Sequence, residues 1–171
     1  MHVTLTLTTQ ANHHVVTNMF TAYFYELAQF DDNLIINDHG LPMWAPSGGE
    51  GPRTHAECVR FNWWIRDRCE LWLVRADGRP VGFTIILRAD ENLPEGVDIE
   101  LMDFYITPKY RRQGVGAQAA RAAFDLYQGR WVVYQLERNR AARAFWQQVI
   151  GNYTGGAYQN LSNGTEQRFT N

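Results

Sequence analysis

The sequence predicts a mixed α/β (α+β) domain on a single sheet that is mostly antiparallel with a central parallel pair. Asp77-Gly78 separates two β-rich runs, which is a strong hairpin signal. Farther along, a helical pattern separates strand-like runs at 97–106 and 131–136, and a helical crossover makes its flanking strands parallel neighbours. The 171 residues are 45% hydrophobic and can bury one core. Residues 1–171 are therefore predicted to form a single domain of about six or seven strands.

The first third of the chain is predicted to hold a strand, a helix, a loop and a second helix. Residues 3–8 alternate apolar and polar side chains, as in a half-buried strand. From 12 to 29, apolar residues recur at three- and four-residue steps, as on one helical face. Residues 31–52 are rich in Asp, Pro and Gly and are expected to form a long loop. Residues 54–67 keep helical spacing over part of their length. The aromatic group Phe61, Trp63, Trp64 and Trp72 is interpreted as core, with an acceptor pocket as the alternative.

The remaining elements follow in an order that defines the sheet. Runs 70–75, 80–87 and 97–106 predict an antiparallel meander. A helix over 114–128 is expected to stop at Gly129, and the strand at 131–136 follows it. Asn139 is a good N-cap for another helix, for which Gly151 is the predicted end. The tail, with Asn163-Gly164 between short runs, predicts a closing hairpin.

Composition narrows the class of function. A net charge of -2 and a pI near 6.2 argue against binding to nucleic acid or to acidic membranes. The N-terminus lacks a secretory signal and no apolar run approaches the roughly 20 residues of a membrane span, so a cytoplasmic protein is expected. Cys58 and Cys69 are interpreted as packing residues. No ligand spacing points to a metal site.

The turn from Thr107 to Gly116 carries the most chemical information. It leaves a strand, contains Lys109, Arg111 and Arg112, and brings two glycines to a helix start, which is the pattern of an anion site. An ordinary glycine-rich turn stays open as an alternative. A dinucleotide fingerprint also fits Gly114, Gly116 and Ala119, but seven residues separate Ile106 from Gly114, whereas that fold places the first glycine directly after the strand. No Gly-Lys-Ser/Thr follows, which excludes a P-loop.

The sequence resembles the GCN5-related N-acetyltransferase (GNAT) family, whose signature Q/R-x-x-G-x-G/A is met by Arg111, Gly114 and Gly116. The order of elements over roughly residues 69–151 matches as well. The resemblance implies an acyl-CoA N-acyltransferase fold whose central parallel strands splay around acetyl-CoA. It also implies an acetyltransferase without a metal, in which a primary amine of a small molecule or protein attacks the thioester in a ternary complex.

The resemblance further implies which residues contact the cofactor. Backbone amides near the signature would hold the pyrophosphate, strand residues would pair with the pantetheine arm, and Asn139 with residues of its helix would contact that arm too. The residues implied are Phe104, Tyr105, Ile106, Arg111, Arg112, Gln113, Gly114, Val115, Gly116, Ala117, Asn139, Ala142 and Phe145.

Acetyl transfer also needs a base, because a free amine has a pKa of about 10. Glu100 lies eleven residues before Arg111, the spacing of the glutamate base in histone-acetylating members of the family. Strand alternation places Glu100 on the face of Met102, Phe104 and Ile106, with Asp103 on the opposite face. Glu100 is therefore the predicted base. A carboxylate paired with a nearby arginine, or a water relay, stays open.

The sequence departs from the family at the tyrosine that often protonates the leaving thiolate, since Trp146 occupies that position. Tyr153 is the predicted replacement, with Tyr134, water or no acid as alternatives.

Two other classes of function stay open. The missing tyrosine would fit a non-catalytic acetyl-CoA-binding regulatory module, and a purely structural interaction domain is the third class. A homodimer and the identity of the amine also stay open; candidate acceptors include small amines, aminoglycoside-like antibiotics, protein amines and aminoacyl-tRNA, the last disfavoured by the acidic charge.

Overall fold

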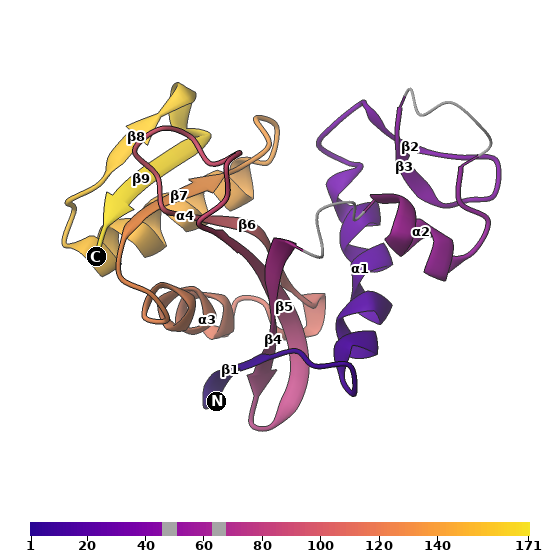
Figure 1. Ribbon diagram of the computed structural model, residues 1–171, viewed down its shortest axis with the longest axis horizontal. Helices are drawn as coiled ribbons and strands as arrows, with labels where there is room; N and C mark the ends of the chain where they lie inside the picture. The colour runs from indigo at the N-terminus through magenta and orange to yellow at the C-terminus, as the bar shows by residue number, and fades with distance from the viewer. Residues whose placement is uncertain (46–50, 63–67) are drawn as a thin grey trace. The chain divides into compact units, whose positions relative to one another are not determined.

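The computed structural model describes residues 1–45, 51–62 and 68–171 (Figure 1). These residues form two compact units. The larger unit contains residues 1–8 and 68–171, and the smaller unit contains residues 9–67. Each unit is described by itself below.

The larger unit is built on a seven-stranded sheet with the strand order β1-β4-β5-β6-β7-β9-β8 (Figure 1). All neighbouring strands are antiparallel except β6 and β7, which are parallel. The predicted fold class, strand number and parallel pair are confirmed. The strands are β1 (Val3–Leu7), β4 (Cys69–Ala76), β5 (Arg79–Arg88), β6 (Ile99–Ile106), β7 (Arg130–Tyr134), β8 (Gln159–Leu161) and β9 (Glu166–Thr170).

The β4–β5 hairpin forms where the sequence predicts it. Asp77 and Gly78 have φ of 48° and 78°, the left-handed values that a two-residue hairpin turn requires. Strand β5 is buried from Val81 to Leu87 and has a neighbouring strand on each edge, β4 and β6. Gly82 lies so close to β6 that a Cβ there would be 2.0 Å from the Tyr105 carbonyl oxygen. The glycine thus permits close pairing of β5 with β6.

A β-bulge in β6 changes which side chains share a face. Ile85 of β5 pairs with Asp103 and the next residue, Ile86, pairs with Leu101, so Met102 is an extra residue. The bulge reverses the alternation, and Asp103 follows Glu100 onto one face of the sheet while Phe104 follows Leu101 onto the other. The predicted face assignment, with Asp103 opposite Glu100, is wrong because of this inserted residue.

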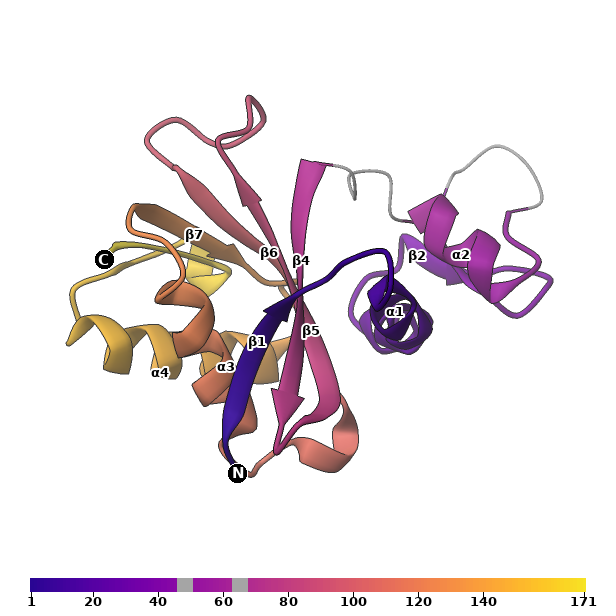
Figure 2. The same ribbon diagram turned by 60° about the horizontal axis from the view of Figure 1, so that its bottom comes forward.

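Two helices cover the face of the sheet that bears Leu101 and Phe104 (Figure 2). Helix α3 (Val115–Phe124) follows the glycine-rich turn, and α4 (Arg140–Thr154) begins at its predicted cap, where Asn139 Oδ1 accepts from the Ala142 N–H at 3.0 Å. The predicted end of α4 at Gly151 is wrong. The helix continues to Thr154, and its C-cap Gly155 has a φ of 63°, which allows the Gly156 N–H to close the end on the Gly151 carbonyl.

Asn171 ties the end of α3 to the sheet. Its side-chain Nδ2 donates to the Phe124 and Tyr127 carbonyls at 2.7 and 3.1 Å. Its Oδ1 accepts from the Gly129 N–H at 3.1 Å and from Trp131 Nε1 at 3.2 Å. These bonds hold the end of α3 at Phe124, earlier than the predicted end at residue 128.

The smaller unit contains α1 (His13–Leu27), a two-stranded sheet and α2 (His55–Asn62). The long loop predicted for residues 31–52 is wrong in part, since β2 (Leu34–Ile36) and β3 (Pro42–Trp44) form a short hairpin. Asn37 closes its turn by accepting the His39 and Leu41 amides on its side-chain oxygen. The rest of that predicted loop, 46–50, and the end of the predicted helix, 63–67, lie outside the described residues, as do Trp63 and Trp64 of the aromatic group.

Candidate active site

The glycine-rich turn connects β6 to α3 through a short 3₁₀ turn, Pro108–Tyr110. Two residues of the turn adopt left-handed backbone conformations, Arg112 with φ of 60° and Gly114 with φ of 77°. A left-handed conformation costs an arginine roughly 1–2 kcal/mol. Such strain is typical of turns that aim backbone groups at a ligand.

Six consecutive backbone amides, from Arg112 to Ala117, have no hydrogen-bond acceptor in the described part of the chain; the first helical bond runs from the Gln118 N–H to the Gly114 carbonyl. The start of a helix carries a partial positive charge in addition to these N–H groups. The turn therefore has the unpaired backbone N–H groups that the predicted anion site requires.

The Arg111 side chain stabilises the turn from behind. Its Nε donates to the Ile106 carbonyl at 2.6 Å, and its guanidinium carbon lies 5.5 Å from the centre of the Tyr105 ring. Gln113 Nε2 donates in the same way to the Lys109 carbonyl at 2.7 Å. These two side chains brace the turn.

The predicted cofactor residues of three segments converge beside this turn. The Phe104 ring of β6 lies 6.0 Å from the Phe145 ring of α4, centre to centre and nearly parallel. A Cβ on Gly116 would be 3.3 Å from Phe145, so the first turn of α3 lies against the same ring. Ala142 lies about one turn before Phe145 on α4, and Asn139 is the N-cap that precedes the helix. The Tyr105 side chain packs on Phe83 across the sheet, on the opposite face.

An open edge lies next to these residues. The β6–β7 ladder pairs Ile99, Glu100 and Leu101 with Trp131, Val132 and Val133, and it stops there. Strand β6 continues to Ile106, whereas β7 ends at Tyr134. The half of β6 from Met102 onward therefore has no strand on its β7 side within the described residues.

Glu100 lies at the point where this edge opens, on the face opposite α3 and α4. Its register neighbours are Leu87 on β5 and Val132 on β7, both buried. Burial, and secondarily the charge of Asp103, raise the pKa of Glu100 to about 7. The predicted alternative, an arginine paired with Glu100, is not seen among the described residues. A carboxyl with a pKa near neutrality is suited to accept a proton at physiological pH.

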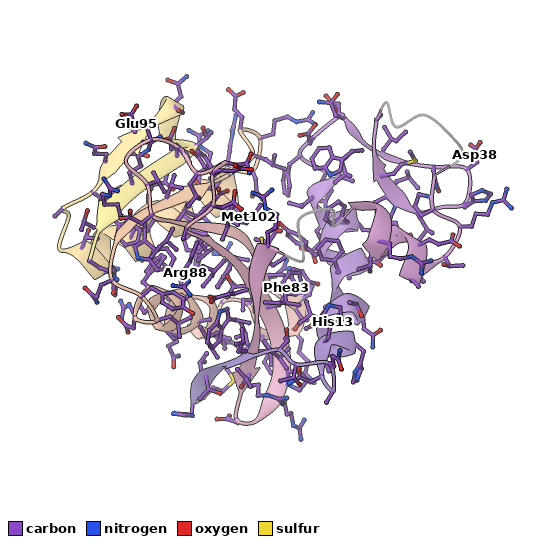
Figure 3. All side chains as sticks on the ribbon, in the orientation of Figure 1. His13, Asp38, Phe83, Arg88, Glu95 and Met102 are labelled. Carbon is purple, nitrogen blue, oxygen red and sulfur yellow. The ribbon has the colours of Figure 1, made fainter. Side chains whose placement is uncertain are left out.

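Two sulfur atoms lie beside the same carboxylates. Cys69 is the first residue of β4, and its Sγ contacts Met102 Sδ at 3.4 Å. Met102 is labelled in Figure 3. Burial and the charges of Asp103, Glu100 and Asp90 raise the pKa of the Cys69 thiol to about 12. Cys58 is fully buried in the smaller unit. With Cys58 buried and Cys69 half-buried, both lie where the predicted packing residues would.

The structure does not bring Tyr153 together with Glu100. The Tyr153 hydroxyl donates to Asp125 Oδ1 at 2.8 Å and accepts from Asn171 at 3.2 Å, and its ring packs on Phe124 at the end of α3. Trp146 is 5% exposed and packs edge-on against Phe104, so it belongs to the core. Trp72, an aromatic residue proposed for an acceptor pocket, also packs against the core beneath the helices.

Sequence reasoning missed that Asp103 shares the face of Glu100. No local signal reveals this, because the extra residue is defined by the pairing of β6 with β5. Sequence reasoning also missed Arg168 and Glu166, which β9 brings to the same face as Glu100 through the pairing of β9 with β7. Nothing local in the sequence reveals that neighbourhood.

The profile of the acetyltransferase (GNAT) family matches residues 33–151, more than half of the chain. The chain belongs to the GNAT family. The predicted resemblance is thereby confirmed for the signature turn, the central strands and the first turns of α4. A search of curated protein sequences finds no match.

Solved GNAT-like structures share the fold at low sequence identity. An acetyltransferase from Thermus thermophilus is 17% identical with a TM-score of 0.62, over 100% of this chain and 98% of that one. A Corynebacterium glutamicum protein described as histone acetyltransferase HPA2 and related acetyltransferase is 16% identical with a TM-score of 0.62, over 98% and 94%. The aminoglycoside acetyltransferase AAC(6')-Ib, in complex with coenzyme A and kanamycin, is 15% identical with a TM-score of 0.60, over 99% and 95%.

Two further findings concern metal and membrane. Within the described ranges, no three His, Cys, Asp or Glu side chains gather in a way that could hold a metal ion. The helices in those ranges are also too short or too polar to cross a bilayer.

Proposed function

We propose that this GNAT protein transfers the acetyl group of acetyl-CoA to a primary amine of a small molecule or protein, by direct attack in a ternary complex. Residues 1–171 would act as one N-acetyltransferase domain in the cytoplasm. The observation that carries the proposal is the run of six unpartnered amides, Arg112 to Ala117, beside the open edge of β6. This arrangement fits a pyrophosphate followed by an extended arm.

Backbone groups of Phe104 and Ile106 would pair with that arm, and Gly116 and Phe145 would contact it. The thioester supplies the activated acetyl group when the cosubstrate is bound. Glu100 would take the proton from the attacking amine. Its raised pKa makes the carboxylate a stronger base, and a value of about 7 still leaves part of it ionised at neutral pH. Catalysis would otherwise depend on holding the two substrates in reach.

Calorimetry with coenzyme A and acetyl-CoA, followed by a thiol-release assay with a panel of amines, tests the proposal. The panel includes kanamycin, which one solved relative binds, a lysine peptide, a peptide N-terminus and spermidine. We expect binding with a micromolar Kd and thiol release with at least one amine. Absence of binding would refute the proposal, and binding without thiol release from any amine would support a regulatory acetyl-CoA-binding module instead.

A further inference from the structure

A second ionisable side chain, Tyr134, shares the face of Glu100 at the open edge. Tyr134 is the last residue of β7 and lies two positions beyond Val132, the partner of Glu100. Residues two apart on a strand point to the same face. Because the ladder ends at Leu101 and Val133, Tyr134 is also the first residue of β7 beyond the last pair. Its side chain is 41% exposed, so it can meet a ligand.

Strand β9 supplies the surroundings of the phenol. Tyr134 pairs with Glu166, and Val132 pairs with Arg168, so both β9 side chains lie on the Tyr134 face. Arg168 Nε donates to Glu166 Oε1 at 2.6 Å, and Glu166 Oε2 accepts from Ser162 Oγ at 2.8 Å. Glu166 is 9% exposed, so the carboxylate that holds Arg168 is itself buried.

The positive charge of the Arg168 guanidinium acts on the Tyr134 hydroxyl, where it opposes the rise in the pKa of the phenol. A guanidinium has only donors, so it can meet only the lone pairs of the phenol oxygen. Its charge also favours a hydroxyl proton that points away from Arg168. Tyr134 is thereby left with a hydrogen-bond donor for another group, whereas the Tyr153 hydroxyl is committed to Asp125.

We propose that Tyr134 is a catalytic hydrogen-bond donor of this site, whose O–H stabilises the carbonyl oxygen of the acetyl group, and that Arg168 is its positioning residue. The proposal rests on the acetyl transfer proposed above. As the amine nitrogen bonds to the carbonyl carbon, the C=O π electrons move to oxygen, which accepts the Tyr134 hydrogen bond. When the C–S bond breaks, its electron pair leaves on sulfur, and Glu100 holds the proton of the amine. Tyr134 keeps its own proton throughout.

The electrostatics of the site support donation without proton transfer. Burial, then the charges of Glu166 and Glu100, raise the pKa of Tyr134, although Arg168 opposes them. A thiolate leaving group with a pKa of about 8.5 needs no proton from such a phenol. The phenol therefore stays protonated and available as a donor over the neutral pH range.

The test compares Tyr134→Phe with Tyr158→Phe in the thiol-release assay, using the most active amine of the panel. Tyr158 is a matched control because its hydroxyl has no partner among the described residues. We expect Y134F to lower kcat by about 10²- to 10³-fold, as loss of one donor to an oxyanion does. The KM for the amine and the calorimetric Kd for coenzyme A should stay within about twofold of wild type, because the phenyl ring remains. Y158F should match wild type.

The positioning role of Arg168 is tested with Arg168→Gln and Arg168→Lys. Gln should lower kcat with little change in either KM, and Lys should recover part of the loss because it restores a cationic donor. Coenzyme A binding by each variant verifies the fold. An active wild type with an unchanged kcat in Y134F, or with only a raised KM for the amine, would overturn the role of Tyr134 alone. A wild type that binds no coenzyme A or acetylates no amine would overturn both proposals.

Discussion

At the scale of single residues, the environment of Glu100 sets how the protein should respond to pH. The carboxyl is flanked by buried Leu87 and Val132 and faces the charge of Asp103, which together raise its pKa to about 7. A base works only when ionised. The proton-accepting form of Glu100 is therefore half populated near neutrality and predominates above it.

We predict that kcat/KM rises with pH and levels off above a midpoint of about 7. Asp103→Asn should move the midpoint to lower pH, because it removes the second cause of the shift. Glu100→Gln should abolish this limb and lower kcat by about 10²- to 10⁴-fold. Steady-state kinetics from pH 5.5 to 9 measure all three. A midpoint that stays unchanged in E100Q would assign it to another group.

The same carboxyl should make stability depend on pH. The pKa of Glu100 is higher in the folded state, about 7, than in the unfolded state, about 4.3. The resulting contribution to the free energy of unfolding is fully present below a pH of about 4.3 and is lost as pH rises through about 7. Thermal unfolding of wild type and E100Q checks this sign. The Tm of wild type should fall relative to that of E100Q between pH 4.5 and 7.5, and a relative rise would contradict the assigned shift.

Cys69 should be chemically inert despite being a free thiol. The thiolate is the reactive form, and a thiol pKa of about 12 leaves almost none of it at pH 8. We expect native Cys58→Ser protein, in which Cys69 is the remaining cysteine, to react with an aromatic disulfide at least about a hundredfold more slowly than a free thiol does. Adding E100Q should increase the rate modestly. Rapid reaction of the native protein would show that Cys69 is not held in this environment.

At the scale of elements, the parts that were predictable are those whose local chemistry allows few alternatives. Asp77-Gly78 tolerates positive φ, Asn139 caps a helix with its own side chain, and Gly114 supplies a left-handed residue before α3. In each case a local backbone requirement, a positive φ or a capped helix end, is met by one of the few residue types that can meet it. The hairpin, α4 and the turn therefore follow from local pattern.

The elements that were not predictable depend on distant partners. The bulge at Met102 is defined by the register between β5 and β6, so the sequence of β6 alone does not reveal it. The β2–β3 hairpin has strands of three residues each, which are too short for an alternation signal. The neighbourhood of Tyr134 and Arg168 depends on a pairing between β7 and β9.

The left-handed turn before α3 gives a prediction at this scale. Gly114→Ala should weaken coenzyme A binding about tenfold, because alanine disfavours the φ of 77° by roughly 1–2 kcal/mol. The nearest atom to an added Cβ is Gln118 Nε2 at 3.7 Å, so space within the protein is not limiting. Gly114→Asn is the matched control, since asparagine tolerates this conformation, and it should bind more tightly than G114A. Equal losses in calorimetry would indicate that the Cβ itself obstructs the ligand.

At the scale of the whole larger unit, one side chain joins elements from distant parts of the sequence. Asn171 bonds to the end of α3, to the segment before β7 and to the Trp131 indole. We predict that Asn171→Ala lowers the free energy of unfolding by about 2 kcal/mol, because it leaves several partly buried groups unpaired. Asn92→Ala, which removes an exposed side chain bonded to Asp90, should change it little. Urea unfolding of both variants measures the difference, and equal values would remove this role of Asn171.

Strand β6 is paired with β7 over only part of its length. Among the described residues, the backbone from Met102 to Ile106 has no strand on the side where β7 would continue, and an extended pantetheine arm bound there would pair with it as a strand does. Binding of the cosubstrate would then change the rate of amide hydrogen exchange in β6. Amide protons in this half-strand should exchange with deuterium markedly more slowly in the presence of coenzyme A, while those of β1, at the other edge of the sheet, should keep their rates. The bound cosubstrate would then complete the sheet at the place where the protein's own strands leave it open.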